Sequence, residues 1–330
     1  MVNDKSINAP SLLQLPPLGT SATSRSSSHG GVIEVYENGF AFVDQVGLMR
    51  GYLSSSGIIG LFVVCFGLFV SFRMGAFDWL SLLLVFMLFV FLLFVQTDWI
   101  GYRYEPVLFD RGSGKVHIFK SLGLPWWQWG WNLIGRPKFE VQTFDWACVE
   151  GQVSTFTIFT GQVARRESSL VLSIKDGPNG LVEIQRVGVG PSFAYGDTVG
   201  PVERWEYVRR AMRGEGPIWA KGEVRYQDFG VSFSEALTLG QPLIGPGSAK
   251  NWRRGPLMWL LGAASLVFFP ITAYLGMNRY ISYCLKRRPV WPESIKASIG
   301  AGPFNEATLA SLEESLMLSG EKSKRKVKKS

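Results

Sequence analysis

The sequence predicts a membrane protein of the α+β class, with an N-terminal transmembrane helical hairpin, an antiparallel sheet or barrel outside the bilayer, and a third apolar helix near the C-terminus. Apolar residues make up 47% of the 330 and aromatic ones 14%. Three uncharged apolar blocks are each close to the roughly 20 residues that a spanning helix needs. Between the second and third blocks, short alternating segments separated by turns are typical of strands. The blocks are 52–72, 79–97 and 255–278.

Residues 1–31 are predicted to form a disordered tail, because the run SATSRSSSHGG is too polar to bury enough apolar surface to order itself. Residues 32–50 follow as a juxtamembrane β-hairpin. Here VIEVYENGFAFV alternates on both sides of Asn38-Gly39, and Asn-Gly between alternating strands is a strong hairpin signal. Since an isolated hairpin is only marginally stable in water, this one is expected to pair with or pack against the larger soluble domain.

Residues 51–97 are predicted to form a two-helix transmembrane hairpin. Only residues 73–78 join the first two apolar blocks, so the two helices must run antiparallel. The tail and the following domain are therefore expected on one side of the membrane. No cleavage pattern of a secretory signal peptide accompanies the first block, and the first helix is expected to stay as an anchor.

Residues 98–254 are predicted to form the soluble domain, built mainly of antiparallel strands. Its first hairpin, VLFDRGSGKVHIFK, contains Gly114-Lys115 in a glycine-rich loop. A phosphate-binding loop needs a glycine and a Ser or Thr where this chain has Phe109 and Val116, so the loop is expected to be a turn with glycines in left-handed positions. The predicted strands are 106–110, 115–119, 139–144, 148–159, 170–174 and 181–187.

The segment 201–213 is predicted to be an amphipathic helix that closes the soluble domain. It has a proline in its first turn, and Gly214 ends it. Trp205, Val208 and Met212 follow helical spacing and share one face. A series of strands followed by one such helix is the order found in a pleckstrin-homology-like barrel, in which the helix closes one open end of the barrel. A plain antiparallel sheet with one helix packed across it is the alternative.

Two groups of side chains are predicted as interaction candidates. The four tryptophans between residues 121 and 136 either dip into the lipid headgroup layer, which suits an apolar ring with a polar N–H, or pack against the soluble domain. The arginines of the predicted helix 201–213 leave its apolar stripe and are expected to form a basic patch for an acidic partner or anionic lipid. The candidates are Trp126, Trp127, Trp129, Trp131, Arg209, Arg210 and Arg213.

The third apolar block, 255–278, contains Pro270, so it either spans the membrane with a kink or enters and leaves by the same face. Residues 279–330 are predicted to hold short helices, including 305–317, and a polybasic tail that attracts anionic lipid. If the block spans, the basic residues after it conflict with a cytoplasmic soluble domain. A cytoplasmic domain is nevertheless the orientation we expect.

The sequence predicts no catalytic, cofactor or metal site. His29 and His117 are the only histidines, and three cysteines imply no disulfide framework. Neither a zinc cluster nor a Ser-His-Asp triad can be assembled from these residues, and no nucleic-acid-reading motif is present. Lone carboxylates on strands are usually solvated, which makes an enzyme at the bilayer surface the weaker hypothesis. The carboxylates considered are Asp145, Glu150 and Glu183.

The order of parts in this chain is a helical hairpin, a strand pair ending in FDRGSGKVHIF, then FDWACVEG and a closing PVWPESI. This order resembles that of an uncharacterised bacterial inner-membrane family, which is often encoded near type VI secretion or other toxin genes. The resemblance covers most of residues 35–300 and supplies no catalytic residues. It implies membrane attachment and a place in interbacterial competition. We therefore expect a non-enzymatic protein that binds the lipid bilayer and a protein partner, such as a toxin or secretion component, as an immunity protein or adaptor. A lipid or small-ligand sensor is the alternative.

Overall fold

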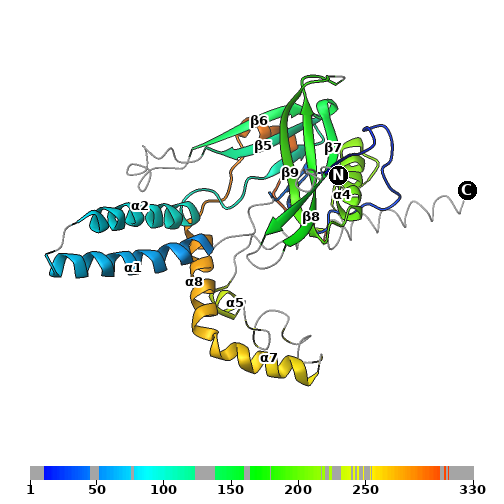
Figure 1. The fold of residues 1–330 in the computed structure, drawn as a ribbon. Coiled ribbons are helices and arrows are strands. Elements are labelled where there is room, and N and C mark those ends of the chain that lie inside the picture. The colour runs from blue at the N-terminus through cyan, green and yellow to red at the C-terminus, as the bar shows by residue number, and fades with distance from the viewer. Residues whose placement is uncertain are drawn as a thin grey trace, which may run out of the picture.

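In the computed structural model, two antiparallel sheets form the body of the protein and a long helical hairpin projects from it (Figure 1). The structure describes residues 11–44, 52–75, 78–122, 138–159, 164–178, 180–216, 218–219, 223–224, 232–238, 241, 244, 248, 253, 255–304, 308–309 and 311. Of the predicted elements, the helix 305–317 and the polybasic tail lie almost entirely outside these residues.

The five-stranded sheet contains both predicted hairpins. Its strands follow the order β2-β3-β4-β5-β6, and every neighbouring pair is antiparallel. Because β3 pairs with β4, the juxtamembrane hairpin joins the sheet of the soluble domain as predicted, and the helical hairpin is an insertion between two neighbouring strands. The strands are β2 (Val32–Tyr36), β3 (Gly39–Phe42), β4 (Val107–Asp110), β5 (Lys115–Ser121) and β6 (Phe139–Asp145).

The glycine-rich loop between β4 and β5 is a turn, and its two glycines have different roles. Gly114 has a φ of +65°, a left-handed conformation that favours glycine. Gly112 does not share this conformation, contrary to the prediction. A side chain at Gly112 would instead lie 2.9 Å from the carbonyl oxygen of Ser298, so glycine allows the C-terminal segment to approach closely.

The second sheet has four strands in the order β1-β7-β8-β9, and the described strands form no closed barrel. The first half of β8 carries the polar run ARRESS, and it pairs with β7 through the backbone although it lacks the expected apolar alternation. For this reason β8 and β9 are longer than predicted. The strands are β1 (Ser11–Gln14), β7 (Val149–Phe159), β8 (Ala164–Lys175) and β9 (Glu183–Ala194).

Helix α4 (Val199–Arg213) confirms the predicted amphipathic helix and packs against both sheets. It ends at Gly214, whose φ of +72° is the left-handed conformation that terminates many helices. Trp205 is fully buried, and a side chain at Gly151 would lie within 2.6 Å of its indole, so β7 approaches the helix closely at this glycine. The same core includes Phe40, Phe42 and Phe109 from one sheet and Val153, Leu170 and Leu172 from the other.

The motif PVWPESI covers the opposite face of the five-stranded sheet. Trp291 is buried there, with its ring centroid 5.9 Å from that of Phe119. Helix α9 (Glu293–Ile299) adds the buried side chains of Ile295 and Ile299. The five-stranded sheet is therefore packed on both faces, and this motif serves the fold.

Helices α1 (Tyr52–Arg73) and α2 (Trp79–Trp99) form the predicted antiparallel hairpin. Both contain segments long and apolar enough to cross a membrane. Their apolar side chains mostly face outward; Phe62, for example, is 76% exposed. A core helix of a soluble protein would instead be largely buried. The helices approach closely at Gly60, where an added side chain would lie 2.4 Å from the ring of Phe91.

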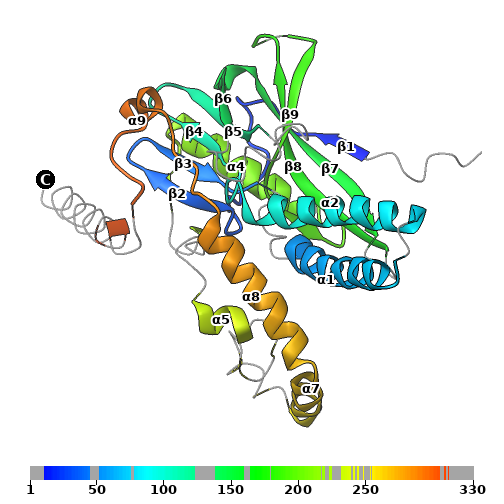
Figure 2. The same ribbon diagram turned by 90° about the vertical axis from the view of Figure 1, so that its left-hand side faces the viewer.

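The third apolar block is two helices with a break, not one long helix. Helix α7 (Pro256–Val267) ends before Phe268, and α8 (Phe269–Leu285) begins directly after it, with Pro270 in its first turn. Helix α8 continues past the predicted end at residue 278 and runs across the base of the α1–α2 hairpin (Figures 1 and 2). Helix α5 (Phe233–Thr238) lies against α8.

Candidate functional site

Residues 11–31, which we name the strap, lie across the four-stranded sheet and α4. Strand β1 pairs with the edge of β7, and the backbone N–H of Leu15 donates to the carbonyl oxygen of Gly151 at 3.0 Å. The side chain of Leu15 is buried in the core. The predicted disordered tail is therefore wrong for these residues. Strand pairing and charged side chains of α4 supply the contacts that the polar composition of the strap does not reveal.

Helix α4 presents different faces to the sheets and to the strap. Trp205, Val208 and Met212 lie in the core, as their spacing predicts. Residues 203, 206, 210 and 213 recur at helical intervals of three and four, so they form a second stripe. Each of them bonds to the strap; the stripe consists of Glu203, Glu206, Arg210 and Arg213.

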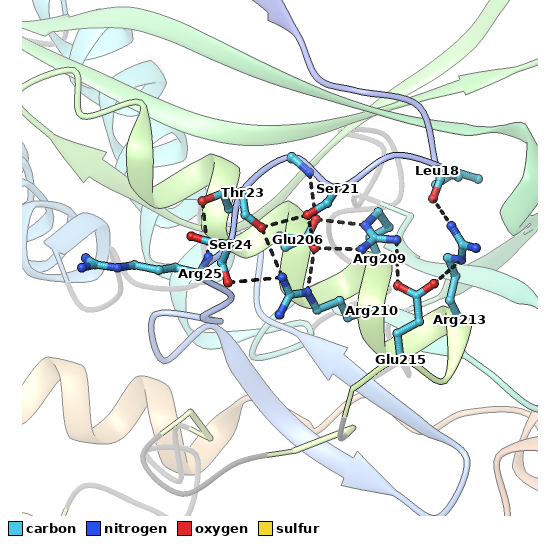
Figure 3. Close-up of polar contacts among 11 residues, drawn as sticks. Leu18, Ser21, Thr23, Ser24, Arg25, Glu206, Arg209, Arg210, Arg213 and Glu215 are labelled. Carbon is cyan, nitrogen blue, oxygen red and sulfur yellow. Dashed lines mark hydrogen bonds and ion pairs between the residues drawn. The ribbon is translucent and has the colours of Figure 1, made fainter.

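The carboxylate of Glu206 is the centre of these contacts (Figure 3). From the strap it accepts hydrogen bonds from the hydroxyl of Ser21 at 2.9 Å and from the backbone N–H of Ala22 at 3.0 Å. From its own helix it accepts two from Arg209, at 2.9 and 2.8 Å, and one from Arg210 at 2.6 Å. Burial alone would raise the pKa of Glu206, but the hydrogen bonds from Arg209, Ala22, Arg210 and Ser21 outweigh it and lower the pKa to about 2.

Two arginines bind the backbone of the strap. Arg210 donates to the carbonyl oxygens of Thr23 and Ser24, both at 3.2 Å, and Arg213 donates to that of Leu18 at 3.0 Å. These bonds reach main-chain atoms and do not depend on which side chains the strap carries. The site therefore holds the strap by its main chain.

The predicted exposed basic patch is wrong for Arg209. Arg209 is buried and pairs with both Glu206 and Glu215, at 2.8 and 3.0 Å. Arg213 also pairs with Glu215, at 2.9 Å. The two carboxylates compensate much of the positive charge that the arginine spacing suggests. We call Arg209, Arg210 and Arg213, together with Glu206 and Glu215, the arginine cluster.

Arg204 fixes the C-terminal end of the strap. Its fully buried guanidinium donates to the carbonyl oxygens of Ser28, Val189 and Pro191, at 3.2, 2.9 and 2.7 Å. Burial lowers the pKa of Arg204 to about 9, while the charge of Glu223 opposes that shift, so Arg204 is charged at neutral pH. Ser28 in turn donates its backbone N–H to Glu223 at 2.6 Å. The buried charges of Glu206 and Arg204 therefore hold the middle and the C-terminal end of the strap, while strand pairing holds its N-terminal end.

A second buried polar cluster surrounds Asp110. Its carboxylate accepts hydrogen bonds from Ser113 and Ser298, and these lower its pKa although burial alone would raise it. His117 lies 3.7 Å from Asp110, and its other ring nitrogen lies 2.9 Å from the hydroxyl of Thr143. Burial lowers the pKa of His117, and the charge of Asp110 opposes that shift. His117 thus lies between an acid and a hydroxyl, as in a nucleophilic triad, but 3.7 Å is too long for a hydrogen bond between its ring and the carboxylate of Asp110.

The remaining candidate residues are not brought together. Trp126, Trp127, Trp129 and Trp131 lie outside the described residues. Glu150 pairs with Lys175 at 3.5 Å, and Glu183 accepts a hydrogen bond from Ser173 at 2.6 Å. Within the part of the chain that the structure describes, no group of three or more His, Cys, Asp and Glu side chains could hold a metal ion.

Glu206, Glu215 and Arg204 were not among the predicted residues. The one sequence signal for Glu206 is the set of charged residues at positions 203, 206, 210 and 213, whose spacing places them on a second face of the helix. A solvated helix face gives the same signal. The partner of this face, the strap, lies far away in the sequence and has a composition typical of disorder.

Comparison with curated proteins found no match, and comparison with solved structures found none either. A family model matches residues 84–303, from the first half of α2 to the segment after α9. The strap and α1 precede the matched region. Because the match covers well over half of the chain, the protein belongs to the DUF6708 family, a family of unknown function.

Proposed function

We propose that this chain is a non-enzymatic membrane protein that binds a protein partner at the strap. The observation that carries the proposal is how the strap is held. The arginine cluster binds its carbonyl oxygens, and β1 adds to the edge of β7. Strand addition with main-chain hydrogen bonds is a general mode of peptide recognition. Main-chain contacts of this kind support binding of a peptide segment and not turnover of a substrate.

The proposed docking edge is β1. Among the described strands β1 pairs with β7 alone, which leaves its other side at the edge of the sheet. Leu12 and Leu13 are 43% and 53% exposed, so both faces of this edge carry an apolar side chain. An edge strand with exposed leucines is a template for another strand. The partner we propose therefore contributes an extended segment with apolar side chains.

The charges at the base of the hairpin support a multi-pass protein of the bacterial inner membrane with a cytoplasmic soluble domain. Arg103, which follows α2, donates its backbone N–H to the carbonyl oxygen of Arg287 at 2.9 Å. The basic run 286–288 therefore lies on the side of the hairpin where the sheets lie. The tip carries Arg73 together with Asp78. Positive charge favours the cytoplasmic side. Among the described residues only α1 and α2 are long and apolar enough to span, which supports a cytoplasmic location for residues 286–288 as well.

Reporter fusions at Gly30 and Gly214 test this orientation. Both sites are expected on the same side of the membrane, because the hairpin returns the chain to the side from which it entered. The positive charge at the base of the hairpin makes the cytoplasm the expected side. A phosphatase reporter active only in the periplasm and a fluorescent reporter active in the cytoplasm should agree at the two sites. Opposite compartments would contradict the hairpin, and a shared periplasmic location would contradict the charge argument.

The resemblance to the inner-membrane family encoded near toxin-delivery genes supports an immunity protein or adaptor as the role. The alternative of a lipid or small-ligand sensor rests on a different observation. Strands β4 to β9 followed by α4 are in the order of a pleckstrin-homology-like domain. The bonds from the arginine cluster to the strap favour the first proposal, since they engage a peptide backbone.

Site-specific photocrosslinking in native membranes tests the docking edge. A photoreactive amino acid at Leu13 should form a discrete protein adduct, whereas the same group at Leu181, which is 94% exposed on the β8–β9 connection, should not. Leu12→Lys should abolish the Leu13 adduct, since a charge on an edge strand opposes strand addition. Leu181→Lys is the matched control and should leave it unchanged. Equal adducts from both positions, or a Leu13 adduct that survives Leu12→Lys, would contradict the proposal.

A further inference from the structure

Helices α7 and α8 are each too short to carry the chain across a bilayer. Helix α7 has 12 residues and α8 has 17. At about 1.5 Å per residue these correspond to about 18 and 26 Å, less than the roughly 30 Å of a hydrocarbon core. Helix α7 turns off sharply from the end of α8 that lies away from the base of the hairpin (Figure 1). The pair therefore does not add up to one spanning helix.

The surface of α7 is apolar and exposed. Its sequence PLMWLLGAASLV contains no charged residue. Leu257, Leu260 and Val267 are 68%, 68% and 77% exposed, and Phe268 and Ile271 continue this surface across the break. An apolar surface of this extent is stable in water only when another apolar partner covers it. Helix α8, from which α7 projects, packs against both α1 and α2.

The polar groups at the break between the two helices are satisfied by protein. The side chain of Gln241 is buried and donates to the hydroxyl of Thr272 at 2.7 Å and to the carbonyl oxygen of Ser265 at 3.3 Å. Its carbonyl oxygen accepts a hydrogen bond from the hydroxyl of Ser265 at 3.0 Å. Irregular backbone at membrane depth is tolerated where protein satisfies its polar groups. The break is therefore suited to a site without water.

The C-terminal end of α8 is tied to the base of the hairpin. The hydroxyl of Ser282 donates to the carbonyl oxygen of Asp98, near the end of α2, at 2.7 Å. The backbone N–H of Arg287 donates to the carbonyl oxygen of Gly101 at 3.0 Å. Before α7, Arg253 is exposed. Basic residues thus flank both ends of the α7–α8 segment, where they match the negative charge of lipid headgroups.

We propose that α7 and α8 form a re-entrant anchor, which enters the leaflet on the side of the soluble domain and leaves it by the same side. The acyl chains of that leaflet cover Leu257, Leu260 and Val267, and its headgroups meet Arg253 and residues 286–288. This anchor would add a third membrane attachment next to the hairpin and fix the soluble domain against the bilayer. The proposal does not depend on partner binding.

Thiol labelling of the full chain in membranes tests the proposal. The background carries Cys65→Ser, Cys148→Ser and Cys284→Ser, and single cysteines are then introduced with a membrane-impermeant maleimide as the probe. Arg253→Cys and Arg288→Cys should react from the same side as a reference, Gly214→Cys. Val267→Cys should react about tenfold more slowly than the reference from either side until detergent is added, because it lies among lipid chains. Ile271→Cys is a second position at the break with the same expectation.

Each outcome bears on the anchor. Reaction of Arg253→Cys and Arg288→Cys from opposite sides would show a spanning segment and overturn the proposal. Fast reaction of both Val267→Cys and Ile271→Cys without detergent would show that the break faces water and would overturn it as well. Neither result would affect the crosslinking expected at Leu13, so the two proposals fail independently.

Discussion

Replacing Trp205 by alanine is expected to destabilise the protein by roughly 3–5 kcal/mol, the usual cost of truncating a buried tryptophan. The indole is fully buried between the two sheets, and its centroid lies 5.5 Å from that of Trp146. Within the described residues its N–H finds no acceptor, so the loss is one of packing. Domains are commonly stable by only about 5–15 kcal/mol, and the loss is comparable with that margin.

Denaturant unfolding of the full chain in detergent, followed by circular dichroism, measures this loss. Trp205→Phe is the matched control, since it keeps an aromatic ring in the same site and should cost clearly less than alanine. Equal midpoints for the wild-type protein and Trp205→Ala would mean that α4 does not close the core as described.

Replacing Glu206 by glutamine is expected to have the second largest effect. The substitution keeps the size of the side chain but removes the charge that Arg209 and Arg210 share. Breaking a buried ion pair by removing one partner typically costs about 3–5 kcal/mol. The strap should lose its central contact at the same time, since a neutral amide no longer compensates the two guanidinium groups. We expect lower stability together with release of the strap.

The same carboxylate should make stability depend on acid. The pKa of Glu206 is lowered to about 2 in the folded protein, from an ordinary value of 4.5. A lowered pKa contributes stability above the unfolded pKa, and that contribution is lost as the pH falls toward the folded pKa. The unfolding midpoint of the wild-type protein should therefore fall as the pH drops from about 5 toward 2, and the difference from Glu206→Gln should shrink over the same range.

Glu215→Gln is the control for both effects. This residue belongs to the same cluster and pairs with Arg209 and Arg213, but its side chain is 42% exposed. Exposed ion pairs contribute about 0–1 kcal/mol, so the substitution should leave stability and its pH dependence nearly unchanged. If Glu215→Gln and Glu206→Gln behaved alike, the central role of Glu206 would be wrong.

The strand and helix patterns of the soluble domain were largely predictable because they are local. Asn38-Gly39 predicts the β2–β3 hairpin, and the spacing of Trp205, Val208 and Met212 predicts the buried face of α4. The break at Phe268 follows from Pro270, which has no N–H for a helical hydrogen bond and whose ring clashes with the carbonyl four residues earlier. In each case neighbouring residues alone decide the conformation. The division of the strands into two sheets depends instead on pairing between distant segments, which periodicity does not encode.

The candidate site was predicted only in part for the same reason. The three arginines are visible in the sequence, but their partners are the strap and two carboxylates, and the contacts with the strap bridge more than 180 residues. Arg209 shows the consequence. Its helical position alone indicates an exposed side chain, whereas Glu206 three residues earlier and Glu215 make it a buried ion-pair partner.

Amide hydrogen exchange of the strap in the full chain tests the central claim of this account most directly. The backbone N–H groups of Leu15, Ala22 and Ser28 are hydrogen-bonded to Gly151, Glu206 and Glu223. They should exchange much more slowly than the same amides in a free peptide of residues 11–31. In Glu206→Gln the protection of Ala22 should be lost, while in Glu215→Gln it should remain. Exchange of all three amides at the rate of the free peptide in the wild-type protein would contradict the docked strap and the interaction site built on it.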